Sequence, residues 1–291
     1  MINKISEKIK NKSGDNLNTD FRFNPELKNT PLVIFCHGFK GFKDWGGFPY
    51  LMEKIASEDF FGVSFNFSYN GVGDSADEQI DFTRLDLFAQ NTFSRELDDL
   101  GSIIDYLFDN KDKYNYDTGN VTLIGHSRGG GIAILKTAED KRITKLIVLS
   151  SVNNFNRYTE VLKSKWKEVG YFEVLNARTN QMMRMNYTLI EDLEKNKERL
   201  DIQKAISEIT TPLLLIHGTQ DITVDYSNAE DLYARHIEKN NSNKENTELI
   251  LIEKTGHTFG TVHPYQGRTK AFEEVITLIL DFLKKNFINE F

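Results

Sequence analysis

The chain lacks the features that define several large classes of protein. It holds a single cysteine in 291 residues, Cys36, so no disulfide can form within it. Because Cys36 lies inside an apolar run, we expect it to be a buried hydrophobic residue. No apolar run reaches the ~18 residues of a membrane-spanning helix, and residues 1–16 are too polar for a secretory signal. We therefore predict a cytoplasmic protein without a membrane span.

The chain also lacks an excess of positive charge. The chain has 36 Lys and Arg residues against 43 Asp and Glu, which gives a net charge of −7. A nucleic-acid-binding face needs a local basic excess, so we expect no nucleic-acid partner. The Cys and His residues do not follow metal-ligand spacing. Residues 70–75 lack the third glycine or the lysine of a nucleotide-binding loop. We expect neither a metal nor another cofactor.

What the sequence does contain is a regular alternation of strand and helix patterns. Several strand candidates are hydrophobic without polar alternation, which is typical of strands covered on both faces. They are Leu32–Cys36, Val63–Phe67, Val121–Ile124, Leu146–Leu149, Leu213–Ile216 and Glu248–Ile252. Helix patterns lie between them, at about 48–58, 91–109, 128–139, 226–239 and 268–286. This order predicts a mostly parallel sheet with helices on both faces.

Two segments depart from this alternation. At the start, Ser13-Gly14-Asp15 separates Lys4–Lys10 from Asn18–Phe23, which predicts an antiparallel hairpin. Later, about 60 residues separate Leu149 from Leu213, where a strand–helix–strand link needs only about 30. We expect residues 152–208 to form an inserted helical cap on a core made of residues 1–151 and 209–291.

The strongest chemical signal is the segment Gly125–Gly129, which reads GHSRG. It fits the G-x-S-x-G pattern, directly follows a strand candidate and precedes a helix candidate. In such a turn the serine backbone is strained, and glycines two positions away on either side avoid a collision. The strain exposes the hydroxyl above the edge of the sheet. We predict that Ser127 is a catalytic nucleophile.

A serine hydroxyl needs a base, and His257 is the first candidate. It follows the strand Glu248–Ile252, at the sheet edge where ligands bind in open α/β sheets. His263, six residues on, is the second candidate. We expect His236, on a polar helix, to be solvated. The remaining histidines precede glycine or serine at strand ends, and we expect them to shape turns by hydrogen bonding; they are His37, His126 and His217.

The base needs a carboxylate to orient it and to stabilise its charged form. Asp221 follows the strand Leu213–Ile216 directly, and we favour it as this acid. Asp225 is the alternative, although its position suits a carboxylate at a helix N-terminus equally well.

An acyl-transfer site also needs two backbone donors for the oxyanion. We expect one to be the N–H of Arg128, the residue after the nucleophile. The glycine-rich loop His37–Gly41 follows the strand Leu32–Cys36, and the N–H of Phe39 is the best second donor. In the cap, Trp166, Met182 and Met183 are candidates for the substrate pocket; the alternative is that they form the cap's own core.

Taken together, these residues resemble the α/β-hydrolase superfamily. The order His37-Gly38, Gly73-Asp74-Ser75, Ser127, Asp221 and His257 matches its pattern over nearly the whole chain. His37-Gly38-Phe39 and the segment Gly125–Gly130 are similar to dienelactone-hydrolase-like and cinnamoyl/feruloyl-esterase-like enzymes. Dienelactone hydrolases proper have a cysteine where this chain has Ser127.

The resemblance implies an α/β-hydrolase fold with an inserted cap and hydrolysis of a small-molecule carboxylic ester without a cofactor. Peptidases, thioesterases and lipases share the same motifs. A non-catalytic binding protein of this fold is a further alternative, against which the complete set Ser127, Asp221 and His257 argues.

Overall fold

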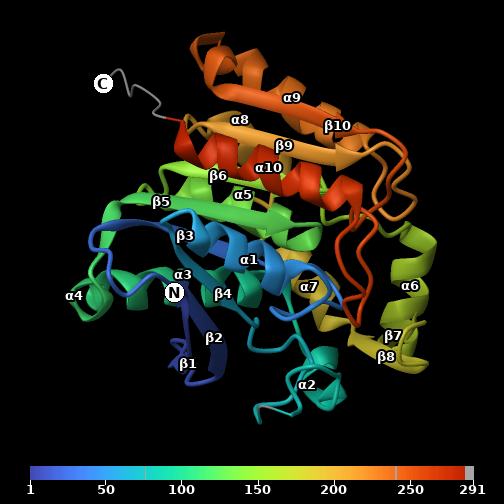
Figure 1. Ribbon diagram of the computed structural model, residues 1–291. Helices are drawn as coiled ribbons and strands as arrows, with labels where there is room; N and C mark the ends of the chain where they lie inside the picture. The colour runs from blue at the N-terminus through green and yellow to red at the C-terminus, as the bar shows by residue number, and fades with distance from the viewer. Residues whose placement is uncertain (76, 240, 286–291) are drawn as a thin grey trace.

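The computed structural model describes residues 1–75, 77–239 and 241–285, and it is built around one eight-stranded sheet (Figure 1). The strand order is β1-β2-β4-β3-β5-β6-β9-β10. All neighbours from β4 to β10 are parallel, whereas β1 and β2 form an antiparallel hairpin that joins β4. The bounds are β1 Asn3–Lys10, β2 Asn16–Phe23, β3 Thr30–Cys36, β4 Phe61–Phe65, β5 Tyr116–His126, β6 Lys145–Leu149, β9 Leu213–Gly218 and β10 Thr247–Ile252. The predicted sheet and the predicted N-terminal hairpin are confirmed.

Helices cover both faces of the sheet. In Figure 1, α1 and α10 lie in front of it, and α3, α5 and α8 lie behind. The bounds of the larger helices are α1 Phe48–Ser57, α3 Phe93–Asp109, α5 Arg128–Glu139, α9 Ser227–Lys239 and α10 Lys270–Lys284. Shorter helices are α2 Leu85–Ala89, α4 Lys111–Tyr114 and the 3₁₀ helix Asn241–Asn246. Residue 286, the expected end of the last helix, lies outside the described residues.

The layering explains why the strands are hydrophobic throughout. Along β3, Val33 and Phe35 are buried with α1 and α10 on one face. Leu32 and Ile34 are buried with α3 and α5 on the other. Successive strand residues point to opposite faces, so a strand covered on both sides has no polar face. Cys36 is fully buried, as expected.

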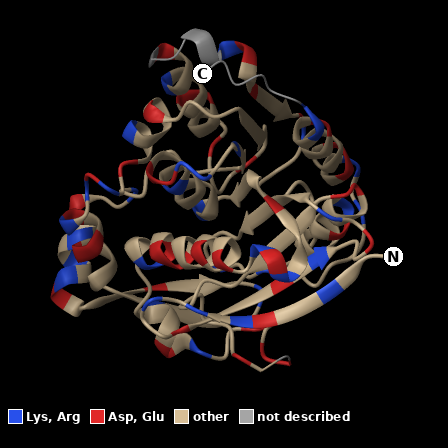
Figure 2. Cartoon of the chain, turned by 90° about the vertical axis from the view of Figure 1, so that its left-hand side faces the viewer, with Lys and Arg blue, Asp and Glu red and all other residues tan. Residues whose placement is uncertain are grey.

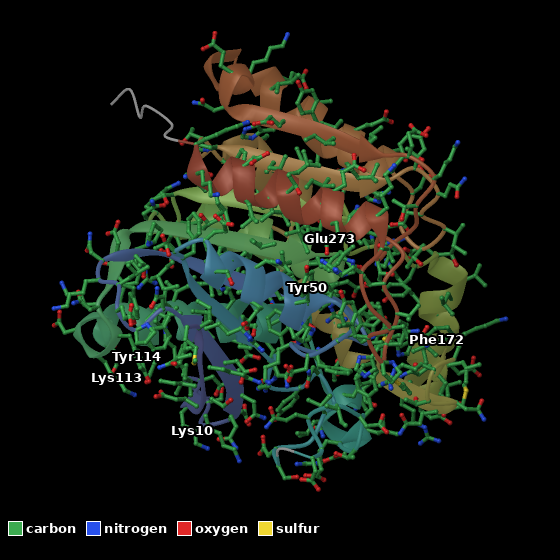
Figure 3. The ribbon with its side chains drawn as sticks, in the orientation of Figure 1. Lys10, Tyr50, Lys113, Tyr114, Phe172 and Glu273 are labelled. Carbon is green, nitrogen blue, oxygen red and sulfur yellow. The ribbon has the colours of Figure 1, made fainter. Side chains whose placement is uncertain are left out.

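The two front helices are also joined by a polar contact. The Tyr50 hydroxyl on α1 donates to Glu273 Oε1 on α10 at 2.9 Å (Figure 3). The loop before α10 carries His257, so the packing of α10 against α1 helps to fix the approach of that loop to the sheet edge.

One strand is displaced from its predicted position. We expected Val63–Phe67, but β4 spans Phe61–Phe65. Just beyond its end, the Asn66 side-chain oxygen Oδ1 accepts from the Lys43 N–H at 2.7 Å. Phe67 is nevertheless buried, since its ring packs edge-on against Phe65 and His37. An apolar residue buried in a loop has the same sequence signature as a strand residue.

The expectation of a purely helical insertion is wrong. Residues 152–208 contain helix α6 Glu160–Val169, a hairpin of β7 Tyr171–Asn176 and β8 Gln181–Asn186, and helix α7 Thr188–Lys195. The alternation in β8 explains the hairpin: Met183 and Met185 are buried, whereas Met182 and Arg184 are exposed. Helix α8 Ile202–Glu208 packs on α5 and α9 and therefore belongs with the core layer.

A search for membrane-crossing helices found none with enough length and apolar character among the described residues.

Candidate active site

Ser127 occupies the turn between β5 and α5. Its backbone has φ 56° and ψ −120°, which is a strained conformation for a residue other than glycine. The turn is held by the Ser127 N–H, which donates to the carbonyl of Leu149 on β6 at 2.8 Å. Strain of this kind persists only where the surroundings impose it, and it is concentrated at functional sites.

The glycines of the motif are required by close packing. A Cβ on Gly125 would lie 2.4 Å from the Gly129 carbonyl oxygen, and a Cβ on Gly129 would lie 2.4 Å from the His37 carbonyl oxygen. Both distances are shorter than any real Cβ contact, so any larger residue would force the turn open. The spacing of the glycines therefore has the steric reason that the sequence suggested.

Two side chains from separate loops meet beside this turn. His257 Nδ1 lies 2.7 Å from Asp221 Oδ2, and Asp221 is 5% exposed. The other carboxylate oxygen, Oδ1, accepts from the N–H groups of Thr223 and Val224. Burial raises the pKa of Asp221, but hydrogen bonds from His217 and His257 outweigh it and hold the pKa well below its usual range. Asp221 is thus an ionised, fixed acceptor for the imidazole.

Asp225 lies elsewhere. It is exposed, and its Oδ1 accepts from the Ser227 N–H at the start of α9. Hydrogen bonds from Ser227 lower the pKa of Asp225. This is the helix-terminal position that the sequence allowed as the alternative for this residue.

A cavity of about 670 Å³ opens over the turn. Ser127 and His257 both line it, as do Phe39 and Arg128, the two residues whose N–H groups we expect to bind the oxyanion. A Cβ on Gly38 would lie 2.9 Å from Ser127 Cβ, so the loop before Phe39 passes directly against the serine. The apolar part of the wall is formed by Trp45, Phe48, Phe93, Val152, Phe155, Tyr158 and Val262.

More than half of the chain is similar to a known protein family. The model of the family described as BD-FAE matches residues 79–236, which include the serine turn and Asp221. The chain belongs to the BD-FAE family.

Individual relatives of this BD-FAE chain are distant but extend over most of it. The protein named "Putative esterase/lipase 2" of Mycoplasma genitalium is 24% identical, with 92% of this chain and 95% of that protein covered. Est1E of Butyrivibrio proteoclasticus, solved with ferulic acid bound, is 17% identical at a TM-score of 0.70, with 96% and 100% covered. An esterase of Pyrococcus furiosus is 19% identical at a TM-score of 0.61, with 97% and 91% covered. The solved structures show that the fold is that of α/β-hydrolases.

His217 is a residue of this site that the sequence reasoning missed. It is fully buried, and its Nε2 lies 3.2 Å from Asp221 Oδ2 and 2.8 Å from the Val224 carbonyl oxygen. Since both neighbours are acceptors, Nε2 carries the proton. His217 therefore donates to the same carboxylate oxygen that His257 contacts. Its position at the end of β9, four residues before Asp221, was the available signal.

Two further histidines support the site and stay neutral. His126 Nε2 lies 2.9 Å from the His257 carbonyl oxygen and holds that loop to the end of β5. Burial, and then the proximity of His257, lower the pKa of His126 to about 3. His37 Nε2 accepts from the Phe67 N–H, and burial lowers the pKa of His37 to about 4. Both shape turns, as the sequence indicated.

The two remaining histidines, His263 and His236, do not take part in the contact with Asp221. His263 lines the cavity, but its Nδ1 accepts from the Gly46 N–H at 3.0 Å. His236 is fully buried, with Nδ1 3.1 Å from the Ile206 carbonyl oxygen. The expectation that His236 is solvated is wrong, because α8 covers the face of α9 that carries it.

The three expected pocket residues of the insertion do not line the cavity. Trp166 and Met183 are at most 1% exposed, and the Trp166 indole N–H donates to the Met185 carbonyl within the insertion. Met182 is 51% exposed. Trp166 instead packs against Tyr158 and Phe172, the latter labelled on β7 in Figure 3. Trp166 and Met183 thus form the insertion's own core, the alternative that the sequence allowed, whereas Met182 belongs to neither the core nor the cavity wall.

Proposed function

We propose that the protein hydrolyses a carboxylic ester through an acyl-enzyme on Ser127, with His257 as the general base and Asp221 as the orienting acid. The hydroxyl oxygen attacks the ester carbonyl carbon while His257 accepts its proton. The N–H groups of Phe39 and Arg128 stabilise the oxyanion. The alcohol leaves with the proton returned by His257. His257 then accepts a proton from water while the water oxygen attacks the acyl carbonyl carbon. The bond to Ser127 breaks, His257 returns the proton to the serine oxygen, and the acid is released.

The single observation that carries this proposal is the contact between His257 and Asp221 beside a strained serine. These residues come from three separate loops. A purely structural role would not require Ser127 and His257 to line one cavity while His257 also contacts a buried carboxylate. The assignment of the chain as an ester hydrolase does not depend on the roles of individual residues. Membership of the BD-FAE family and relatives named as esterases or lipases make the chain an ester hydrolase acting on small molecules.

We also propose that the insertion, expected over residues 152–208 on a core of residues 1–151 and 209–291, acts as a cap through its residues 152–201. Supporting this, one side of the cavity wall comes from the insertion, through Val152, Phe155, Tyr158, Asn176 and Arg178. The packing of α8 on α5 and α9 favours placing the end of the cap before Ile202. A cytoplasmic location stays a prediction from the sequence.

The test combines active-site labelling with turnover. The wild-type protein should react with a fluorophosphonate and hydrolyse p-nitrophenyl esters. Ser127→Ala should do neither while keeping the same thermal midpoint, because a small residue fits the turn. The expected loss in kcat is at least 10³-fold. Turnover close to wild type in purified Ser127→Ala would exclude this nucleophile. Matched thioester and aminoacyl amide substrates would reveal a different preferred bond.

A further inference from the structure

The charge of the cavity wall differs from that of the whole chain. Acidic residues outnumber basic ones by 43 to 36 in the sequence, and Figure 2 shows the two kinds interspersed over the outer elements. Among the described residues that line the cavity, none is Asp or Glu. Four are cationic, namely Lys40, Arg128, Arg157 and Arg178. A concave wall with one sign of charge attracts ligands of the opposite sign.

Two of these cations have no carboxylate partner within the described part of the chain. Arg157 Nη2 donates to the Thr223 carbonyl oxygen at 3.1 Å, and Lys40 Nζ donates to the Leu175 carbonyl oxygen at 3.2 Å. Arg178, by contrast, lies 3.6 Å from Asp81. The positive charges of Arg157 and Lys40 are therefore not neutralised locally.

Arg128 lines the same cavity as Arg157, but its charge has a carboxylate partner. Its side chain is 9% exposed, and its Nε donates to Glu96 Oε2 at 2.8 Å. The guanidinium lies 4.3 Å from the centre of the Phe93 ring, and its buried Nη2 has no hydrogen-bond partner among the described residues. Glu96 neutralises this cation but does not line the cavity. The net positive charge on this side of the cavity thus comes from Arg157.

Tyr158 lines the same cavity and is close enough to both guanidinium groups to be influenced by their charge. Burial raises its pKa, and the proximity of Arg128 and Arg157 acts in the opposite direction. The Tyr158 ring is fixed edge-on against Trp166, with centroids 5.2 Å apart. Within the described residues its hydroxyl makes no hydrogen bond, so it is free to donate to a ligand in the cavity.

We propose that Arg157, Tyr158 and the Arg128 guanidinium form a subsite for an anionic group carried by the ester substrate. The group is a carboxylate or a phosphate monoester, because both offer several acceptor oxygens to a guanidinium and a hydroxyl. This inference rests on the proposed ester hydrolysis at Ser127. It narrows the substrate class to esters that carry a negative charge on the acyl or the alcohol portion.

The experiment compares charged and neutral esters of similar shape. The p-nitrophenyl monoester of adipic acid against p-nitrophenyl hexanoate places the charge on the acyl portion. The pair p-acetoxybenzoate and its methyl ester places it on the alcohol portion, and p-acetoxyphenyl phosphate extends the second series to a phosphate. Wild-type protein should give a kcat/KM at least tenfold higher for the anionic member of one series, and this preference should fall as ionic strength rises.

Arg157→Gln and Tyr158→Phe test the subsite itself. For Arg157→Gln the anionic-to-neutral ratio of kcat/KM should fall by about ten- to a hundredfold, the effect of one charge-assisted hydrogen bond. Tyr158→Phe should lower the ratio less. Arg184→Gln is the matched control: Arg184 lies on β8 in the insertion, is paired with Glu173 and does not line the cavity. It should leave the ratio unchanged.

Equal or better hydrolysis of the neutral member in every series would overturn the subsite, as would a ratio that Arg157→Gln does not lower. If Arg184→Gln lowered the anionic-to-neutral ratio of kcat/KM by the same factor, the preference would follow from the net charge of the protein. That result would also overturn the subsite. The result would be different if the proposed ester hydrolysis were wrong. In that case neither the anionic nor the neutral esters would be hydrolysed, and a fluorophosphonate would not label Ser127.

Discussion

At the scale of single residues, the site depends on how many hydrogen bonds Asp221 accepts. Two backbone N–H groups, His217 and His257 all donate to its two oxygens. A carboxylate held in this way stays ionised and keeps one direction in space. It therefore fixes the tautomer of His257 in which Nδ1 carries the proton and Nε2 is available to accept one.

The two acidic residues of this loop should consequently behave differently. We expect Asp221→Asn to lower kcat by roughly 10³- to 10⁴-fold, because an amide cannot accept from Thr223, Val224 and both histidines at once. Asp225→Asn should change kcat less than about threefold, since Asp225 is exposed and only contacts the start of α9. Steady-state turnover of a p-nitrophenyl ester measures both. The opposite ranking would move the acid to Asp225.

At the scale of elements, the insertion combines two kinds of residue. One group, with Trp166 and Met183, packs α6 against the β7–β8 hairpin and never reaches the cavity. The other group lies on the segment before α6 and faces the cavity; Phe155 stacks on Phe93 with ring centres 4.2 Å apart. Stability and substrate preference are thus assigned to different parts of the same segment.

Alanine substitutions should separate these two roles. Trp166→Ala should lower the free energy of unfolding by about 3 kcal/mol or more, as expected for a fully buried aromatic residue. It should leave the ratio of kcat/KM between aromatic and aliphatic esters unchanged. Phe155→Ala should change that ratio, because it removes part of the cavity wall. Denaturant unfolding and a small ester panel measure both effects. A changed ratio in Trp166→Ala would show that the core of the insertion also controls selectivity.

At the scale of the whole molecule, buried ionisable groups couple stability to pH. Burial lowers the pKa of His37 to about 4, and burial together with His257 lowers that of His126 to about 3. Their stabilising contribution is complete above the unfolded value of about 6.5 and is lost as pH falls toward these lower values. Burial raises the pKa of Asp99 to about 6. Asp99 therefore has the opposite effect on the pH dependence of stability: its stabilising contribution is present at low pH and is lost as pH rises through about 6.

The direction of each pH dependence of stability can be tested with one histidine variant and one aspartate variant. Between pH 6.5 and about 4, His37→Gln should lose stability on acidification less steeply than wild type, by up to about 1.4 kcal/mol per pH unit. Asp99→Asn should lose stability more steeply over the same range. Denaturant unfolding at several pH values measures each slope. Parallel slopes for wild type and His37→Gln would mean that His37 titrates normally in the folded protein.

Features that depend on near neighbours in the chain could be predicted without the structure. The strained turn at Ser127 is encoded by two glycines within two residues of it, and the buried strands by continuous apolar runs. The predicted positions of Asp221 and His257 followed from strand order, since parallel strands end at one edge of the sheet. The β7–β8 hairpin was missed because Met182, Met183 and Met185 were interpreted by composition, although their alternation was visible.

Contacts between side chains from distant segments could not be predicted in this way. The contacts of His257 with Asp221 and of the His126 ring with the His257 carbonyl join segments that are far apart in the sequence. No local pattern records how such segments are placed relative to one another. Phe67 and His236 were misassigned for the same reason, because burial depends on what packs against a residue. Local periodicity reports the faces of an element, whereas contacts between distant elements follow from how the sheet and its layers assemble.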